Sequence, residues 1–157
     1  LGTGSDNAGQ IRIYNNDGET GTYIGNSYLQ AYNQFGERTF FLGTGSTGGG
    51  YLRTYNFDGQ ETAYIGTSAD SSGQMRIYDS IGETGTLIGS GYFRTYNQFG
   101  KMSTYLGNGR DGGGYLRTNN KFETETSFLG TNNANEGLIN LNDKFGQSFW
   151  IRLNKND

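Results

Sequence analysis

Apolar and polar residues alternate along this chain in short segments separated by turn-forming residues. The segments Tyr51–Tyr55 and Glu61–Ile65 show the pattern most clearly, because β-branched and aromatic residues recur there at every second position. This two-residue period predicts β-strands. No stretch shows the 3.6-residue period of an amphipathic helix. The sequence therefore predicts an all-β protein.

A four-residue motif joins the two segments of each pair. It begins with Asn or Asp and usually ends with Gly, as from Asn56 to Gly59. These residue types favour a type I turn followed by a left-handed glycine, which closes a three-residue hairpin loop. Glu123 replaces the glycine in one motif, so we expect that turn to be strained or different. The motifs span residues 15–18, 33–36, 56–59, 79–82, 97–100, 120–123 and 143–146.

The strand–turn–strand unit is repeated seven times. The units begin at Leu1, Ile24, Leu42, Ile65, Ile88, Leu106 and Leu129. Three units form a larger repeat, since residues 1–64 and 65–128 align without a gap. The last unit, 129–157, departs from the pattern, and we expect it to cap the array because terminal repeats must close an exposed edge. We interpret residues 1–157 as one repeat domain and, because Leu1 already lies inside a unit, as the end piece of a longer protein.

Two elongated architectures fit this repeat: a β-solenoid or β-helix, and a meander of stacked β-hairpins. A hairpin with the predicted loop places Thr54 opposite Thr62 and, in the first unit, Ile13 opposite Gly21. A large residue that faces glycine indicates contact, because packed interiors respond to single methylene groups. An arch across a solenoid would give the same compensation. In either architecture, residues two positions apart in a strand lie on the same face. Leu52 and Tyr64 are therefore predicted to share a core face with Thr54 and Thr62.

The opposite face is predicted to carry columns of arginine and tyrosine, together with Ile65 and its equivalents. A fully solvated face does not usually hold so many aromatic and aliphatic residues. We therefore expect it to contact a ligand, another layer or a neighbouring chain. The candidate ligand or interface residues are Arg12, Tyr14, Arg53, Tyr55, Arg76, Tyr78, Arg94, Tyr96 and Arg117.

Composition narrows the possible chemistry. The chain has no Cys and no His, which excludes disulfides, thiolate metal sites and imidazole catalysis. Its net charge of −3 offers no basic field for nucleic acid. No segment approaches the ~18 apolar residues of a membrane-spanning helix. We expect a protein without catalytic activity, cofactor or membrane insertion in this segment, and with apolar packing that relies on its 12 Tyr and 10 Phe.

Three loops partly match the Gly-x-Gly-x-Asp pattern of calcium-binding β-rolls. They make Asp6, Asp70 and Asp111 candidate calcium ligands. In β-rolls, however, such loops recur about every nine residues, so that successive turns share an ion. Here they recur only every 23 residues or more. This spacing favours turn-forming aspartates over a metal site.

The sequence motif Gly-x-Leu-x-x-Tyr-Asn-x-x-Gly, found from Gly50 to Gly59, resembles known fibre repeats. It is similar to β-helical shaft segments of phage tail fibres and to β-solenoid repeats of bacterial cell-surface proteins, and the resemblance covers residues 1–146. Choline-binding hairpin repeats have a similar motif, but they carry several tryptophans for the ligand cage and this chain has only Trp150. The fibre resemblance implies an elongated, often trimeric, extracellular structural element.

These observations lead to two hypotheses of different classes. The first is a non-enzymatic repeat segment of an extracellular fibre or filament, assembled through β-strand stacking and self-associated as a trimer or polymer. The alternative is a glycan- or receptor-binding module, such as a tail-fibre tip or a lectin-like adhesin, which would use the arginine and tyrosine columns. A polysaccharide-cleaving enzyme is disfavoured because the sequence shows no convergent catalytic set.

Overall fold

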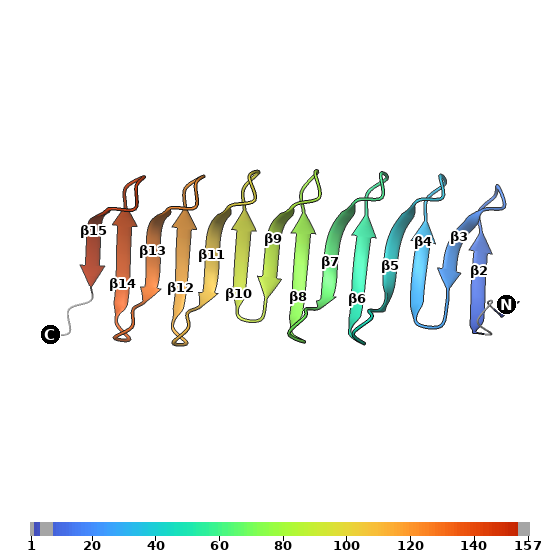
Figure 1. The fold of residues 1–157 in the computed structure, drawn as a ribbon, viewed down its shortest axis with the longest axis horizontal. Helices are drawn as coiled ribbons and strands as arrows, with labels where there is room; N and C mark the ends of the chain where they lie inside the picture. Colours follow the sequence, from blue (N-terminus) through green and yellow to red (C-terminus); the bar gives the residue numbers. More distant parts are fainter. Residues whose placement is uncertain (1, 4–7, 154–157) are drawn as a thin grey trace. The chain divides into compact units, whose positions relative to one another are not determined.

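A computed structural model describes residues 2–3 and 8–153 of the protein, with the backbone alone for residues 151–153. The chain forms two compact units, residues 1–83 and 84–157. Every regular element in the described ranges is a β-strand, which confirms the predicted all-β class (Figure 1). Within these ranges no helix could span a membrane.

Each unit is an antiparallel meander, in which strands adjacent in the sequence are also adjacent in space. The first unit contains β1 (Gly2–Thr3), β2 (Gly9–Tyr14), β3 (Thr20–Ile24), β4 (Tyr28–Tyr32), β5 (Arg38–Thr44), β6 (Gly50–Tyr55), β7 (Glu61–Thr67) and β8 (Gly73–Tyr78). The second contains β9 (Thr84–Gly89), β10 (Tyr92–Tyr96), β11 (Met102–Asn108), β12 (Gly114–Asn119), β13 (Glu125–Thr131), β14 (Gly137–Asn142) and β15 (Ser148–Leu153). The structure thus decides between the two predicted architectures in favour of hairpins.

The Asn-x-x-Gly motifs form the predicted turns, which lie at one edge of the sheet within each unit (Figure 1). In the hairpin of β6 and β7, the Gly59 amide donates to the Asn56 carbonyl at 3.1 Å, and Gly59 has a φ of 77°. The Asn56 side-chain oxygen accepts hydrogen bonds from the amides of Asp58 at 3.1 Å and Gln60 at 2.9 Å. The asparagine side chain therefore satisfies the turn's backbone donors, and glycine supplies the left-handed residue.

Glu123 adopts the same turn as the glycines that it replaces. Its amide donates to the Asn120 carbonyl at 3.0 Å, and its φ is 70°. The expected strain is thus present without a different turn, because the Cβ of a non-glycine residue crowds the backbone in this region of φ.

A β-bulge follows each of these turns within the units. In the hairpin of β6 and β7, Tyr55 pairs with Glu61 as predicted, but the next pair is Thr54 with Ala63, so Thr62 is the extra residue. The pairs β2–β3, β4–β5, β10–β11, β12–β13 and β14–β15 show the same register shift. Because side chains alternate with a period of two, one extra residue moves every later side chain of that strand to the other face.

The predicted assignment of residues to the two faces was therefore wrong for the second strand of each hairpin. Tyr64 lies opposite Arg53, and Ile65 lies opposite Leu52. Of the predicted contacts near the turn, that between Thr54 and Thr62 forms because the bulged residue stays close to its neighbour, whereas Ile13 pairs with Thr22 rather than with Gly21. The Oγ1 atoms of Thr54 and Thr62 are 2.8 Å apart, and a Cβ added at Gly21 would lie 3.5 Å from the carbonyl oxygen of Ile13.

The bulges sort the side chains into an aliphatic face and an aromatic face. Cross-strand pairing joins the aliphatic face into one continuous row per unit. The rows are Ile11, Ile24, Leu29, Leu42, Leu52, Ile65 and Met75 in the first unit, and Ile88, Phe93, Leu106, Leu116, Leu129 and Ile139 in the second.

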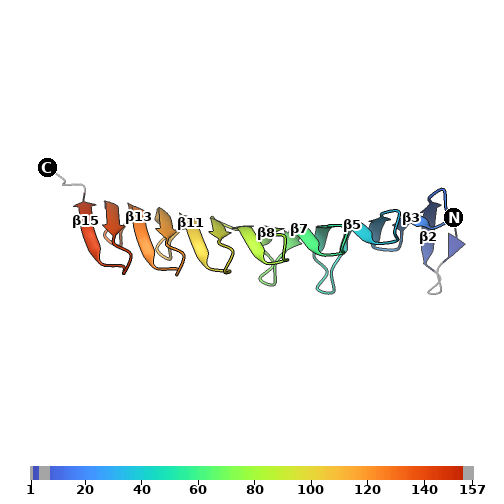
Figure 2. The same cartoon turned by 90° about the horizontal axis from the view of Figure 1, so that it is seen from above.

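Each unit is a single layer of strands (Figure 2). Of the apolar side chains in the described ranges, only Phe41 and Tyr105, at 9% and 7% exposure, are buried. Both belong to the aromatic face. In each unit, the side chains that are most shielded from solvent are therefore aromatic rings rather than aliphatic groups.

Replacement of Glu123 by glycine should stabilise the protein by about 1 kcal/mol, because it removes a left-handed non-glycine residue. The only ion pair lost among the described residues is the exposed one with Lys101, at 4.0 Å, which contributes little. Urea unfolding of E123G measures the gain. The reverse change, Gly100→Glu, at the equivalent position with a φ of 68°, should destabilise by a similar amount; equal stabilities of all three proteins would contradict the strain.

Candidate ligand-binding face

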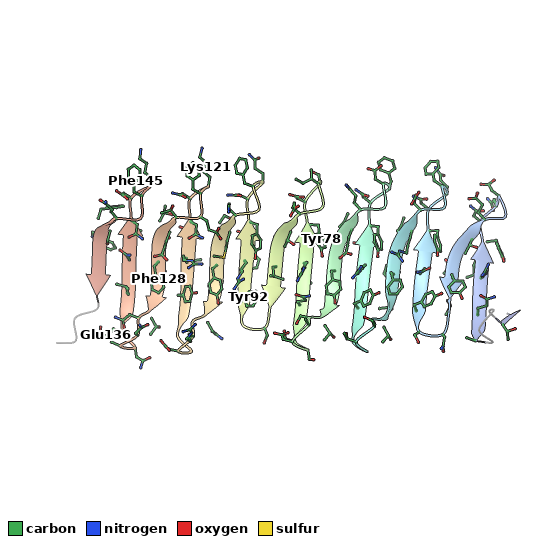
Figure 3. The ribbon with its side chains drawn as sticks, in the orientation of Figure 1. Tyr78, Tyr92, Lys121, Phe128, Glu136 and Phe145 are labelled. Atoms are coloured by element: carbon green, nitrogen blue, oxygen red, sulfur yellow. The ribbon has the colours of Figure 1, made fainter. Side chains whose placement is uncertain are left out.

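Aromatic rings on successive strands form a stacked ladder in each unit. Tyr23, Tyr28, Phe41, Tyr51 and Tyr64 form the ladder of the first unit, with neighbouring centroids between 5.0 and 5.8 Å apart. In the second unit the ladder is Tyr92, Tyr105, Tyr115 and Phe128, with centroids 4.7 to 6.2 Å apart (Figure 3). Contacts of this kind contribute about 0.5–1.5 kcal/mol each beyond area burial.

Glycines opposite the tyrosines make room for these ladders. Gly107 pairs with Tyr92 on one side and Tyr115 on the other. A Cβ at Gly107 would lie 2.7 Å from the Cβ of Tyr92 and 2.5 Å from the carbonyl oxygen of Gly91. Gly43 has the same role in the first unit, where a Cβ would lie 2.8 Å from the ring of Phe41. The rings can lean across the sheet only because these positions lack a side chain.

Arginines of the predicted columns lie over the rings of the ladders. The guanidinium carbon of Arg53 is 4.8 Å from the ring centroid of Tyr51 and 5.5 Å from that of Tyr64. Arg94 lies 4.4 Å from Tyr92 and 5.3 Å from Tyr105. These are cation–π distances. The repeated arginines therefore act first as packing groups that cover aromatic rings.

Shielding of the guanidinium groups supports this assignment. The Nε atoms of Arg53, Arg76, Arg94 and Arg117 are withdrawn from solvent, and none has a hydrogen-bond partner among the described residues. Arg53 also forms an ion pair with Glu61 at 3.2 Å. Burial by itself lowers the pKa of Arg53, but the charge of Glu61 and a hydrogen bond with Tyr55 outweigh it and raise the pKa.

The other predicted columnar residues lie on the same face, and their contacts vary. Arg12 is 5.4 Å from the ring centroid of Tyr23, whereas Arg76 donates to the side chain of Gln74 at 3.3 Å. The four predicted tyrosines follow an arginine by two residues and so share its face. They are Tyr14, Tyr55, Tyr78 and Tyr96.

These tyrosines differ in solvent exposure and in their contacts with other side chains. Tyr14 is exposed, and the Tyr55 hydroxyl accepts a hydrogen bond from Arg38 at 3.0 Å. Burial, followed by the negative charge of Glu61, raises the pKa of Tyr78. Tyr55 and Tyr78 are thus partly engaged in the packing of the sheet itself.

Sequence reasoning missed the residues that the second strand of each hairpin contributes to this face. Tyr64, Tyr105 and Phe128 belong to the ladders. Arg38 lies 4.6 Å from the ring centroid of Tyr55 and was also missed. The bulge places the three ladder residues here, whereas Arg38 lies before the bulge, opposite Tyr32. The available signal for the ladder was an aromatic residue just before the Leu-Gly or Ile-Gly pair that begins five of the seven units.

Of the three aspartates proposed as calcium ligands, the two described ones, Asp70 and Asp111, lie in separate loops. Asp6 is outside the described residues, and Asp111 is exposed in the turn between Gly109 and Gly113. The Asp70 carboxylate accepts hydrogen bonds from the Ser68 hydroxyl and from the Ser72 hydroxyl at 2.7 Å and amide at 3.1 Å. These bonds lower the pKa of Asp70 to about 2.

Asp70 therefore has a structural explanation, since it stabilises its own turn. In the part of the chain that the structure describes, no group of three or more acidic residues lies close enough together to hold a metal ion.

Comparison with known proteins adds no family assignment. No family model matches the chain. A search of curated proteins likewise finds no match.

Replacement of Gly107 by alanine should destabilise the protein by about 1–3 kcal/mol, the usual cost of overpacking, because the new methyl group would overlap Tyr92 and the backbone. Gly114→Ala is the matched control, since a Cβ there meets nothing within 4 Å. Urea unfolding with tyrosine fluorescence measures both variants. Equal stabilities of G107A and G114A would show that the ladder does not depend on the glycine.

Proposed function

We propose that the protein is a non-enzymatic repeat segment of an extracellular fibre or filament, in which copies of the chain associate with one another. Backbone pairing between successive strands supplies cohesion along each unit. The resemblance of the repeat motif to phage-fibre and cell-surface repeats supports the extracellular location. Association as a trimer or a longer polymer is part of this proposal.

The observation that carries the proposal is the exposure of the aliphatic face. Leu42 and Ile65 are 49% and 45% exposed in the first unit, and Leu106 and Leu129 are 53% and 52% exposed in the second. They belong to continuous apolar rows along each unit. Contiguous apolar surface of this kind on a soluble protein marks an interaction site.

A second copy of the chain fits this face better than an unrelated partner. The apolar residues recur at the spacing of the strands, so another copy offers the same spacing and the same chemistry. Two sheets that pack face to face lie ~10 Å apart with their side chains interdigitated. Such an interface would give each copy the second hydrophobic layer that a single unit lacks.

Lysine in place of Ile65 and Leu106 should convert the associated protein to monomers, because burial of an unpaired charge opposes an apolar interface. Light scattering coupled to size-exclusion chromatography measures the mass of wild type and of the double variant I65K/L106K. Gln98→Lys, in an exposed turn, controls for added charge and should leave the mass unchanged. A wild-type protein that stays monomeric at high concentration would exclude the proposal.

Glycan binding by the aromatic face is the second candidate function. The observation that favours it is the regular recurrence along each unit of partly exposed rings and arginines beside polar side chains. Tyrosine combines an apolar ring, which packs on the C–H face of a sugar, with a hydroxyl that hydrogen-bonds. Arginine can pair with acidic sugars. A lectin-like adhesin or a receptor-binding fibre tip would use the face in this way.

A glycan array tests this second function. Wild-type protein should bind a subset of glycans, and Tyr55→Ala with Tyr96→Ala should weaken binding by about tenfold or more, as expected for aromatic hot spots. Phe57→Ala is the control, because Phe57 is an exposed turn residue, 72% accessible, and belongs to neither face. Glycan binding that is indifferent to both tyrosines would count against the columns as the binding surface.

A further inference from the structure

A groove opens on the aromatic face where the repeat pattern of the second unit changes. The larger repeat relates residues 1–64 to 65–128, and continued by 64 residues it relates Arg76 to Asn140 and Gln74 to Leu138. Asn140 lies opposite the last ring of the ladder, Phe128, as Arg76 lies opposite Tyr64. The change therefore removes an arginine beside an aromatic ring.

In the first unit, a second arginine, Arg53, also lies beside the ring of Tyr64. The Arg53 guanidinium lies over the ring of Tyr64 at 5.5 Å and forms an ion pair with Glu61 at 3.2 Å. The repeat relates Arg53, Glu61 and Tyr64 to Arg117, Glu125 and Phe128. The same three kinds of group, a cation, a carboxylate and a ring, are thus available in the second unit.

Their contacts are different there. Arg117 lies over Tyr105 at 6.0 Å and donates to the sulfur of Met102 at 3.9 Å. Of the cations in the described ranges, none lies over the ring of Phe128 and none forms an ion pair with Glu125. The Glu125 carboxylate accepts a long hydrogen bond, 3.5 Å, from the side chain of Asn142. Phe128 and Glu125 therefore lack the arginine contacts that their counterparts Tyr64 and Glu61 make in the first unit.

The space that results is a groove of about 680 Å³. Its walls along β12–β14 include Tyr115, Phe128, Glu125, Leu138, Asn132 and Asn140, and the loop before β12 adds Arg110 and Asp111, whose opposite charges offset each other. Figure 3 labels Phe128 on β13 and Glu136 in the loop before β14. This volume lies in the range of small-molecule sites, roughly 300–1,000 Å³, and exceeds what one side chain would fill.

Amide side chains give the groove spare hydrogen-bonding capacity. The Asn140 amide donates to Asn142 at 3.0 Å and accepts from the Ser148 hydroxyl at 2.6 Å. The Asn132 amide donates to Glu136 at 3.2 Å. Each side-chain amide has two donors and two acceptor sites, so each retains a donor. The groove thus combines an aromatic wall, a carboxylate and amide donors.

We propose that this groove binds a glycan that contains a hexosamine with a free amino group. The ammonium of the sugar would pair with Glu125, as Arg53 pairs with Glu61 in the first unit, and the C–H face of the pyranose would pack on Phe128. The amides of Asn132 and Asn140 would bond its hydroxyl groups, which favours a sugar over the bare cationic side chain of a peptide. This inference rests on the glycan-binding function proposed above and assigns it a site outside the predicted columns.

Isothermal titration of the whole chain with a glucosamine tetrasaccharide tests the inference. The tetrasaccharide should bind, and its fully N-acetylated counterpart should bind at least about tenfold more weakly, because the charge pair with Glu125 is lost. Asn140→Arg, which restores the residue type found at Arg76, should abolish binding. Glu125→Gln should weaken it by a similar factor, and it keeps the inference testable if N140R folds poorly. Gln98→Arg adds the same charge in an exposed turn and should bind like wild type.

Several outcomes would overturn the inference. They are absence of tetrasaccharide binding, equal affinity for the N-acetylated form, or wild-type affinity in folded N140R and E125Q. Binding of a tri-arginine peptide but not of the tetrasaccharide would assign the groove to a peptide partner instead. Binding to other glycans on the array that is lost in Y55A and kept in N140R would leave the glycan-binding function in place and reject this site alone.

Discussion

Stacking of side chains between neighbouring strands takes the place of a hydrophobic core in this protein. A sheet in one layer cannot bury its side chains beneath a second sheet or a helix, so its cohesion depends on backbone pairing and on contacts along its own surface. In both units, tyrosine and phenylalanine rings supply these contacts, and arginines such as Arg53 and Arg94 cover the rings. Like charges at the strand spacing are tolerated because an aromatic ring separates the arginines of a column, as Tyr105 separates Arg94 from Arg117.

This arrangement requires a bulge in each hairpin. Without the extra residue at Thr62, Tyr64 would point to the same side as Leu52 and the ladder would be interrupted on every second strand. The bulge places Tyr64 beside Arg53 and gathers Leu52 and Ile65 on the opposite side. One irregularity next to each turn therefore separates a polar, aromatic surface from an aliphatic one. It also leaves each surface chemically uniform along a unit, which suits contacts with a periodic partner.

Two positions at which the sequence departs from the repeat show how the fold responds to single substitutions. Glu123 shows that the turn is imposed by the hairpin, since a residue with a Cβ adopts the glycine conformation. Asn140 shows the reverse case, in which a smaller residue changes the surface and leaves a groove beside Phe128. Repetition stabilises the scaffold through many equivalent contacts, so single positions are free to diverge without loss of the fold.

The sequence by itself determined the all-β class, the strand and turn positions and the left-handed residue of each loop, because these depend on neighbours within a few positions. Asn56 and Gly59 are enough to specify a turn. The sequence also placed Arg53 and Tyr55 on one face, since both lie on the strand before the bulge. Only the tertiary structure decided that Tyr64, Tyr105 and Phe128 join them and that hairpins, not arches, connect the strands. The physical reason is that the alternation of side chains within one strand does not reveal where a bulge inserts an extra residue. The position of the bulge depends on how two strands pair, and neither strand determines it alone.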